Sequence, residues 1–216
     1  MAAAGAGALP DRAAVSLLLT ANEAGFHRHG DPVFAPVDLS LASGAGTVIL
    51  GANGSGKTTL LRLLAGILSP STGQVQRHAP CAFLGHLPGL KGDLNCRENL
   101  RFQQQFHGNP GLPIDQALAR VGLAGLGLRP ARTLSAGQKK RLGLACLLVA
   151  HRPIWLLDEP YASLDDAGGV LVDQLLAEHL SGGGGFMLST HQRMPDAELA
   201  CQQLELADPR RSRRAA

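Results

Sequence analysis

The pattern of apolar and polar positions predicts that short strands come first in this chain and that helices and strands then alternate. Residues 15–20 are a candidate first strand, and residues 37–41 alternate as a half-exposed strand does. Residues 47–50 are mostly apolar and β-branched, which is typical of a buried parallel strand. The apolar segment 59–68 is a predicted helix, ended by Ser69 and Pro70. We therefore expect a small antiparallel sheet ahead of a parallel α/β core.

Further along, the pattern divides the chain into a helical section and a second set of strands. Helices are predicted at 97–107 and 114–121, within a helical insert at about 95–132. The other predicted elements are turns at 25–31 and 71–73, strands at 74–76, 81–85, 154–157 and 186–191, and helices at 139–150 and 170–180. No repeat or low-complexity linker interrupts the chain, so we expect a single domain over 15–206 that contains the insert.

A glycine-rich loop lies between the predicted strand 47–50 and the predicted helix 59–68. It has the pattern G-x-x-x-x-G-K-T, and its strand–loop–helix context makes a chance glycine-rich turn a poor alternative. The glycines let backbone N–H groups face a phosphate, and the helix N-terminus adds its positive dipole end. Lys57 is then placed for the β- and γ-phosphates and the Thr58 hydroxyl for Mg²⁺. The predicted nucleotide-binding residues are Gly51, Ala52, Asn53, Gly54, Ser55, Gly56, Lys57, Thr58 and Thr59.

Composition narrows the classes of partner. The 216 residues are 45% hydrophobic, enough for a full core, and the net charge of +3 is small and scattered. Because only 4% of the residues are aromatic, we do not expect a base-stacking surface for nucleic acid. The four cysteines lie far apart, which indicates a reducing compartment and no disulfide framework. The apolar runs are too short to cross a bilayer, so no transmembrane segment is expected.

The two ends of the chain differ from the rest. Residues 1–14 are rich in Ala and Gly, and we predict that they are disordered. They lack a charged segment ahead of an apolar block, which argues against a secretory signal, while a degenerate transit peptide stays open as an alternative. Residues 207–216 form a basic tail that either touches anionic lipid headgroups or is a solvated chain end.

Four further motifs follow the glycine-rich loop. Residues 134–138 read L-S-A-G-Q before a predicted helix, and Asp158 and Glu159 end an apolar strand. Residues 162–165 read A-S-L-D, and His191 ends the last predicted strand. Each motif alone has an ordinary alternative, such as a helix cap, a strand-end turn or a structural histidine. In this order and spacing, and together with the loop, they resemble the nucleotide-binding domain of ATP-binding cassette (ABC) ATPases over about 15–205.

This resemblance implies an α/β fold of the P-loop NTPase type, with a mostly parallel core sheet, a small N-terminal antiparallel β subdomain and a helical insert. It implies ATP as the substrate and Mg²⁺ as its metal, held by Thr58 and Asp158. Glu159 would polarise the attacking water as general base, and His191 would contact the γ-phosphate. Asp165 would be the D-loop residue. The signature residues that would contact the ATP of a second copy of the chain are Ser135, Ala136, Gly137 and Gln138.

Two further segments carry a narrower resemblance. Residues 84–91 read L-G-H-L-P-G-L-K and residues 152–160 read R-P-I-W-L-L-D-E-P. Both are similar to the CcmA family, the ATP-binding subunits of the haem-export system of cytochrome c maturation. That resemblance implies integral membrane partners like CcmB and CcmC, and ATP hydrolysis that serves release of a haem-loaded chaperone. It also implies a peripheral position on the cytoplasmic face of the bacterial inner membrane or, as an alternative, on the matrix face of the mitochondrial inner membrane.

Three positions depart from the usual ABC pattern. His86 replaces the Q-loop glutamine, and Ala136 replaces a signature glycine. The aromatic residue that stacks on adenine falls in the turn 26–29, where Arg28 aligns best by spacing and its neighbours stay open as alternatives. Two other functions stay open, namely an ATP-binding subunit of a different ABC transporter and a soluble ABC ATPase of DNA repair or translation. The soluble class is disfavoured because the chain has one cassette and an insert too short for a coiled coil.

Overall fold

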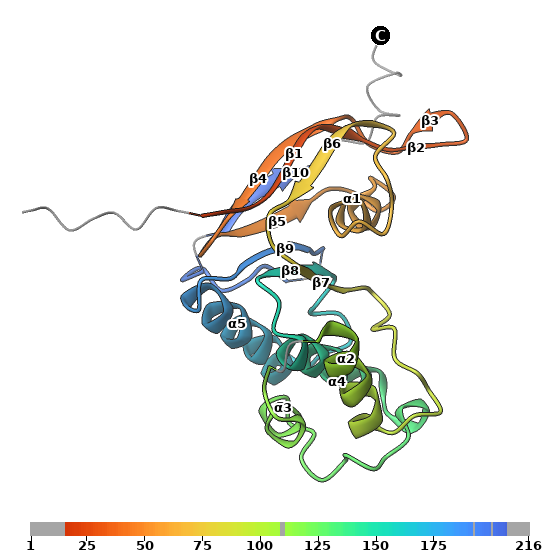
Figure 1. Cartoon of the computed structure of the whole chain (residues 1–216), viewed down its shortest axis with the longest axis vertical. Helices are drawn as coiled ribbons and strands as arrows, with labels where there is room; N and C mark the ends of the chain where they lie inside the picture. The colour runs from red at the N-terminus through yellow and green to blue at the C-terminus, as the bar shows by residue number, and fades with distance from the viewer. Residues whose placement is uncertain (1–15, 109–110, 192, 200, 207–216) are drawn as a thin grey trace, which may run out of the picture.

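The computed structural model describes residues 16–108, 111–191, 193–199 and 201–206. These residues form a parallel core sheet with a smaller antiparallel sheet over one face and helices over the other (Figure 1). The predictions for residues 1–14 and for the tail at 207–216 fall outside the described residues. The architecture confirms the predicted fold class.

The core sheet has five parallel strands in the order β10-β5-β9-β8-β7. Strands β8 and β9 are buried along their whole length because elements cover both faces of the sheet, which explains their apolar sequences. The sequence pattern does not predict β10, because that strand carries only two apolar residues and lies at the sheet edge. The strands are β5 (Gly46–Leu50), β7 (Cys81–Leu84), β8 (Ile154–Asp158), β9 (Gly185–Ser189) and β10 (Cys201–Glu205).

The antiparallel sheet consists of β4 (Val37–Ala42), β1 (Leu17–Gly25) and β6 (Thr72–Arg77), in that order. The predicted turn at 71–73 is wrong, because Thr72 and Gly73 already belong to β6. Gly73 has a φ of 66° beside an irregularity in the pairing with β1, so this glycine serves a distorted strand.

A small hairpin occupies the segment predicted as a turn at 25–31. It consists of β2 (His27–Arg28) and β3 (Asp31–Pro32), and its two tip residues, His29 and Gly30, both have positive φ. This is the backbone geometry of a tight two-residue hairpin turn. The hairpin extends beyond the antiparallel sheet on the side where α1 begins (Figure 1).

Helix α1 (Lys57–Leu64) packs between the two sheets. Four leucines of this helix are fully buried, and they share a core with strands of both sheets. The helix ends at Leu64, four residues before the predicted end, because Gly66 adopts a φ of 76°. The N–H groups of Ile67 and Leu68 then bond back to the Arg62 carbonyl, which closes the helix.

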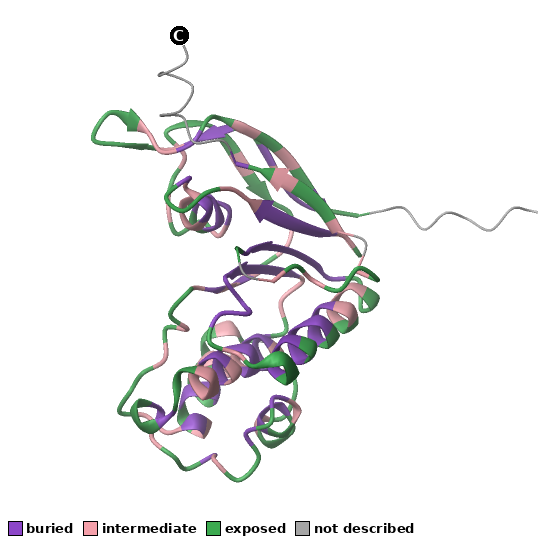
Figure 2. Cartoon of the chain, turned by 180° about the vertical axis from the view of Figure 1, so that it is seen from behind, coloured by how far each residue is buried: buried purple, intermediate pink, exposed green. Residues whose placement is uncertain are grey.

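The other face of the core sheet is covered by α4 (Ala136–Ala150) and α5 (Asp166–Ser181). Helices α2 (Cys96–His107) and α3 (Ile114–Arg120) pack against α4, and a short 3₁₀ helix, η1 (Ala131–Thr133), precedes it. Both α4 and α5 begin earlier than predicted, because Ser135 and Asp165 cap their N-termini. Figure 2 shows the buried core strands and the half-exposed helices. No helix in the described part of the chain combines the length and apolarity needed to cross a membrane.

Candidate active site

The glycine-rich loop joins the end of β5 to the start of α1, as the sequence pattern predicts. Its last glycine, Gly56, has a φ of 100°, and a Cβ there would lie 2.8 Å from the ring of Phe34. A larger residue would therefore be strained and would push against a buried side chain. Glycine lets the loop turn into α1 close to the protein core, and the first N–H groups of that helix remain available to an anion.

Lys57 begins α1 and is buried, with 8% of its surface exposed. Its Nζ donates hydrogen bonds to the carbonyl oxygens of Gly51, at 2.7 Å, and Ala52, at 3.1 Å. The ammonium group is thus held inside its own loop, next to the helix N-terminus. In the same loop, Ser55 Oγ is buried without a hydrogen-bond partner among the described residues. An orphaned hydroxyl in such a loop fits a site whose hydrogen bonding is completed by a ligand.

Asp158 ends β8 and faces the start of α1. The Thr58 hydroxyl lies 3.0 and 2.9 Å from the two carboxylate oxygens of Asp158, and the Ser189 hydroxyl donates to Oδ1 at 2.7 Å. The aspartate is buried, with 3% of its surface exposed. A hydroxyl and a carboxylate are hard oxygen ligands of the kind that Mg²⁺ prefers, so this pair fits the predicted metal.

Glu159 and His191 form a second pair, at the ends of the adjacent strands β8 and β9. His191 Nδ1 lies 2.6 Å from Glu159 Oε1, and the Glu159 N–H donates to the Ser189 carbonyl at 3.1 Å. Glu159 has a φ of 52°, which is uncommon for a residue with a side chain and is often seen at functional sites. The carboxylate and the imidazole can together hold a water molecule and accept a proton from it.

These groups line one open cavity of about 520 Å³ at the carboxyl ends of the core strands, where α/β sheets bind ligands. The structure therefore brings the predicted loop, metal and catalytic residues together. Gly51, Ala52 and Ser55 belong to the loop but do not line the cavity. The predicted residues that line it are Asn53, Gly54, Gly56, Lys57, Thr58, Thr59, His86, Asp158, Glu159 and His191.

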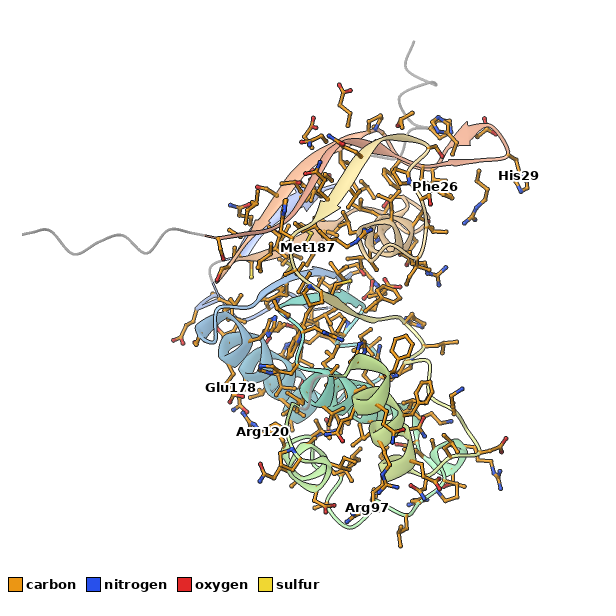
Figure 3. The ribbon with its side chains drawn as sticks, viewed as in Figure 1. Phe26, His29, Arg97, Arg120, Glu178 and Met187 are labelled. Carbon is orange, nitrogen blue, oxygen red and sulfur yellow. The ribbon has the colours of Figure 1, made fainter. Side chains whose placement is uncertain are left out.

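The β2–β3 hairpin supplies one rim of the cavity. Arg28 and His29 line it, together with Asp31, Pro32 and Val33. Figure 3 shows His29 at the tip of the hairpin and Phe26 near its base. Phe26 does not line the cavity, whereas the guanidinium of Arg28 offers a flat surface on which a base can stack.

The signature residues and Asp165 lie outside this cavity. Ser135 caps α4, with its Oγ accepting from Gln138 N–H, and the Gln138 side chain accepts from the Ser135 N–H. Ser135 and Ala136 are exposed. Asp165 caps α5 and pairs with Arg141. The Gly168 N–H and the Arg141 guanidinium hold the pKa of Asp165 below its usual value. Within one chain, these residues stabilise two helix N-termini.

Sequence reasoning missed two residues of the site. Ser189 is the second side-chain partner of Asp158, but a serine near a strand end gives no distinctive signal. Lys140 is buried on α4 and donates to the carbonyl oxygens of His86 and Glu159. The sequence does place this lysine at a core-facing position of an apolar helix. It was missed because Lys139 and Lys140 together look like a solvent-exposed basic pair.

Comparison with known proteins agrees with this geometry. The sequence model of the family described as ABC transporter matches residues 34–162. Over 185 residues the chain is 47% identical to the cytochrome c biogenesis ATP-binding export protein CcmA of Xanthomonas axonopodis pv. citri (strain 306), covering 81% of this chain and 86% of that protein. The protein of the same name from Brucella abortus (strain 2308) is 41% identical over 173 residues, covering 76% of this chain and 80% of that protein.

Solved structures show the same fold. An ATP-binding subunit of an ABC transporter superposes with a TM-score of 0.81 at 22% identity, covering 88% of this chain and 86% of that one. The structure of cbiO1 from Clostridium perfringens, part of the ABC transporter complex cbiONQ, gives a TM-score of 0.70 at 27% identity, covering 89% and 85%.

Proposed function

Because this chain belongs to the ABC transporter family and, within it, to the CcmA group of ATP-binding proteins, we propose that it hydrolyses ATP for an export step of cytochrome c biogenesis. In this haem-export system, ATP hydrolysis serves the release of a haem-loaded chaperone. The observation that carries the enzymatic part is the single cavity that holds Lys57, the Thr58–Asp158 pair and the Glu159–His191 pair.

In this proposal each group has one task. The ammonium of Lys57 and the α1 N-terminus bind the β- and γ-phosphates. Mg²⁺, held by Thr58 and Asp158, would neutralise charge on the phosphate oxygens. Glu159 accepts the proton of the attacking water, and His191, 2.6 Å from its carboxylate, orients that water and the γ-phosphate.

The active form is a dimer of two copies of the chain. Ser135 and Ala136 are exposed at the N-terminus of α4 and do not line the cavity of their own chain. A 15-residue helix that exposes its N-terminus favours an anion there. The signature residues of one copy therefore contact the γ-phosphate that is bound by the other copy.

Integral membrane subunits, like CcmB and CcmC, bind beside His86 and hold the protein on the cytoplasmic face of the inner membrane. The proposed docking surface consists of three large, exposed apolar side chains near His86. They are Leu87, Phe102 and Phe106, which are 81%, 43% and 73% exposed. The two phenylalanine rings stack at 6.1 Å, and Lys91 Nζ lies 4.9 Å from the Phe102 ring centre. Exposed apolar clusters of this kind mark protein contacts.

The surface is tested by replacing Phe106 with Asp. We expect this variant to bind ATP normally and to lose co-purification with the membrane subunits. The matched control is Ile67→Asp, at an apolar residue that is 57% exposed and outside the cluster. Equal recovery of the membrane subunits by both variants would place the docking surface elsewhere.

The biological role is tested in cells that lack this gene. We expect covalent haem in c-type cytochromes to be lost, restored by the wild-type gene and not restored by Lys57→Ala. Haem staining of membrane proteins after denaturing electrophoresis measures this directly. Normal c-type cytochromes in the deletion strain would assign the ATPase to a transporter of another solute.

A further inference from the structure

Lys140 is a buried lysine, with 3% of its surface exposed, one turn into α4. Its Nζ donates to the backbone carbonyl of Glu159 at 3.0 Å and to that of His86 at 3.2 Å. The two carbonyls belong to the segments that follow the neighbouring strands β8 and β7. Burying an ammonium group is costly, and an apolar side chain of similar size would fill the same space more cheaply. The two hydrogen bonds to these carbonyls thus explain why a charged side chain is buried here.

One of the two carbonyls belongs to a strained residue. Glu159 has a φ of 52°, and such a backbone persists only where its surroundings fix it. Its N–H is held by the Ser189 carbonyl, and its own carbonyl accepts from Ala162 N–H and from Lys140. The position of this peptide therefore sets where the Glu159 carboxylate lies relative to His191.

The other carbonyl belongs to His86, whose side chain lines the cavity. The same residue adjoins the exposed Leu87, part of the surface assigned above to the membrane subunits. Burial lowers the pKa of Lys140, while the nearby Asp158 and Glu159 carboxylates raise it and so favour the ammonium form.

We propose that Lys140 is a positioning residue for ATP hydrolysis, which fixes the backbone of Glu159 and ties it to the loop at His86. The inference rests on the proposed role of Glu159 as base and adds the residue that sets its geometry. Movement of the His86 loop by a docked subunit is then transmitted to Glu159 through one ammonium group.

The test compares Lys140→Met with Lys140→Arg in the purified full chain. Methionine has a similar length and no donor, so we expect kcat to fall about 10- to 100-fold, the usual effect of a misplaced catalytic group. KM for ATP should stay near the wild-type value, since Lys140 does not line the cavity. Arginine keeps the charge and the donors, and should restore part of kcat. Arg62→Met, at an exposed cation outside the site, is the matched control.

Amide hydrogen exchange shows directly whether the two segments that Lys140 joins are loosened. In Lys140→Met, the amides of residues 85–87, 89–90 and 161–164 should exchange faster, while the core strands keep their protection. If methionine prevents folding, Lys140→Gln, which keeps one donor group, takes its place.

A folded Lys140→Met variant with wild-type kcat overturns the inference and leaves the ATPase assignment intact. A loss of kcat accompanied by faster exchange throughout the molecule also overturns it, because that result indicates general loosening. Absence of ATP hydrolysis by the wild-type chain would instead contradict the proposed function.

Discussion

The hydroxyl of Thr58 lies within hydrogen-bond distance of both carboxylate oxygens of Asp158, although the two residues are 100 positions apart in the sequence. The contact joins the start of α1 to the end of β8. It places two hard oxygen ligands at the edge of the cavity that also holds Lys57 and Glu159.

Replacing Asp158 with Asn should therefore raise the Mg²⁺ concentration needed for ATP hydrolysis by about tenfold or more, because an amide carries no charge to hold the metal. A titration of ATPase activity with MgCl₂ measures the change. Asp93→Asn is the control, since the Asp93 carboxylate is 92% exposed and pairs with Arg132. An unchanged Mg²⁺ requirement in the Asp158 variant would remove this residue from the metal site.

Lys57→Ala should abolish ATP binding, because it removes the only buried cation of the phosphate loop among the described residues. Equilibrium binding of a fluorescent ATP analogue is the measurement. Arg62→Ala, at an exposed cation on the same helix, should bind as the wild type does. Near-wild-type affinity in Lys57→Ala would mean that the nucleotide binds elsewhere.

His179 should make folding stability depend on pH. Its ring stacks on Trp155 at 3.9 Å, its Nε2 lies 3.1 Å from the Pro153 carbonyl, and burial lowers its pKa to about 4. The unfolded chain binds this proton near pH 6.5, so stability falls as the pH drops from about 7 to 4, by about 3 kcal/mol in total.

Urea unfolding at pH 7.5 and pH 5 measures this dependence. We expect His179→Phe to be less stable at pH 7.5, because it removes the hydrogen bond from His179 Nε2 to the Pro153 carbonyl, and to lose less stability on acidification. His78→Gln, at an exposed histidine, should keep the wild-type pH dependence. The same dependence in His179→Phe would assign it to other groups.

Much of the candidate site could be predicted from sequence because local rules set each part. The phosphate loop needs glycine where φ is positive, as at Gly56, and the two acids follow an apolar strand. Lys140, which joins the segment of Glu159 to the loop at His86, escaped prediction. The partners of Lys140 are two backbone carbonyls from distant segments, and a carbonyl has no residue type to recognise.

The boundaries of the elements show the same limit. The helix predicted to end at Ser69 and Pro70 ends at Leu64, because Gly66 takes a left-handed conformation before the proline acts. Helix α5 begins four residues early because Asp165, predicted as a D-loop residue, is also its N-cap. At each of these boundaries the sequence allows more than one end or start for the helix, and tertiary packing decides which one the chain adopts.

Single-turnover hydrolysis by Glu159→Gln tests most directly whether this chain hydrolyses ATP with Glu159 as the base. Glutamine keeps the shape of the side chain and cannot accept the proton. With radiolabelled ATP and excess enzyme, we expect wild-type binding and a hydrolysis rate lower by about 10²- to 10⁴-fold. Hydrolysis within a few fold of the wild-type rate would contradict the account and would make His191 the first candidate for the base.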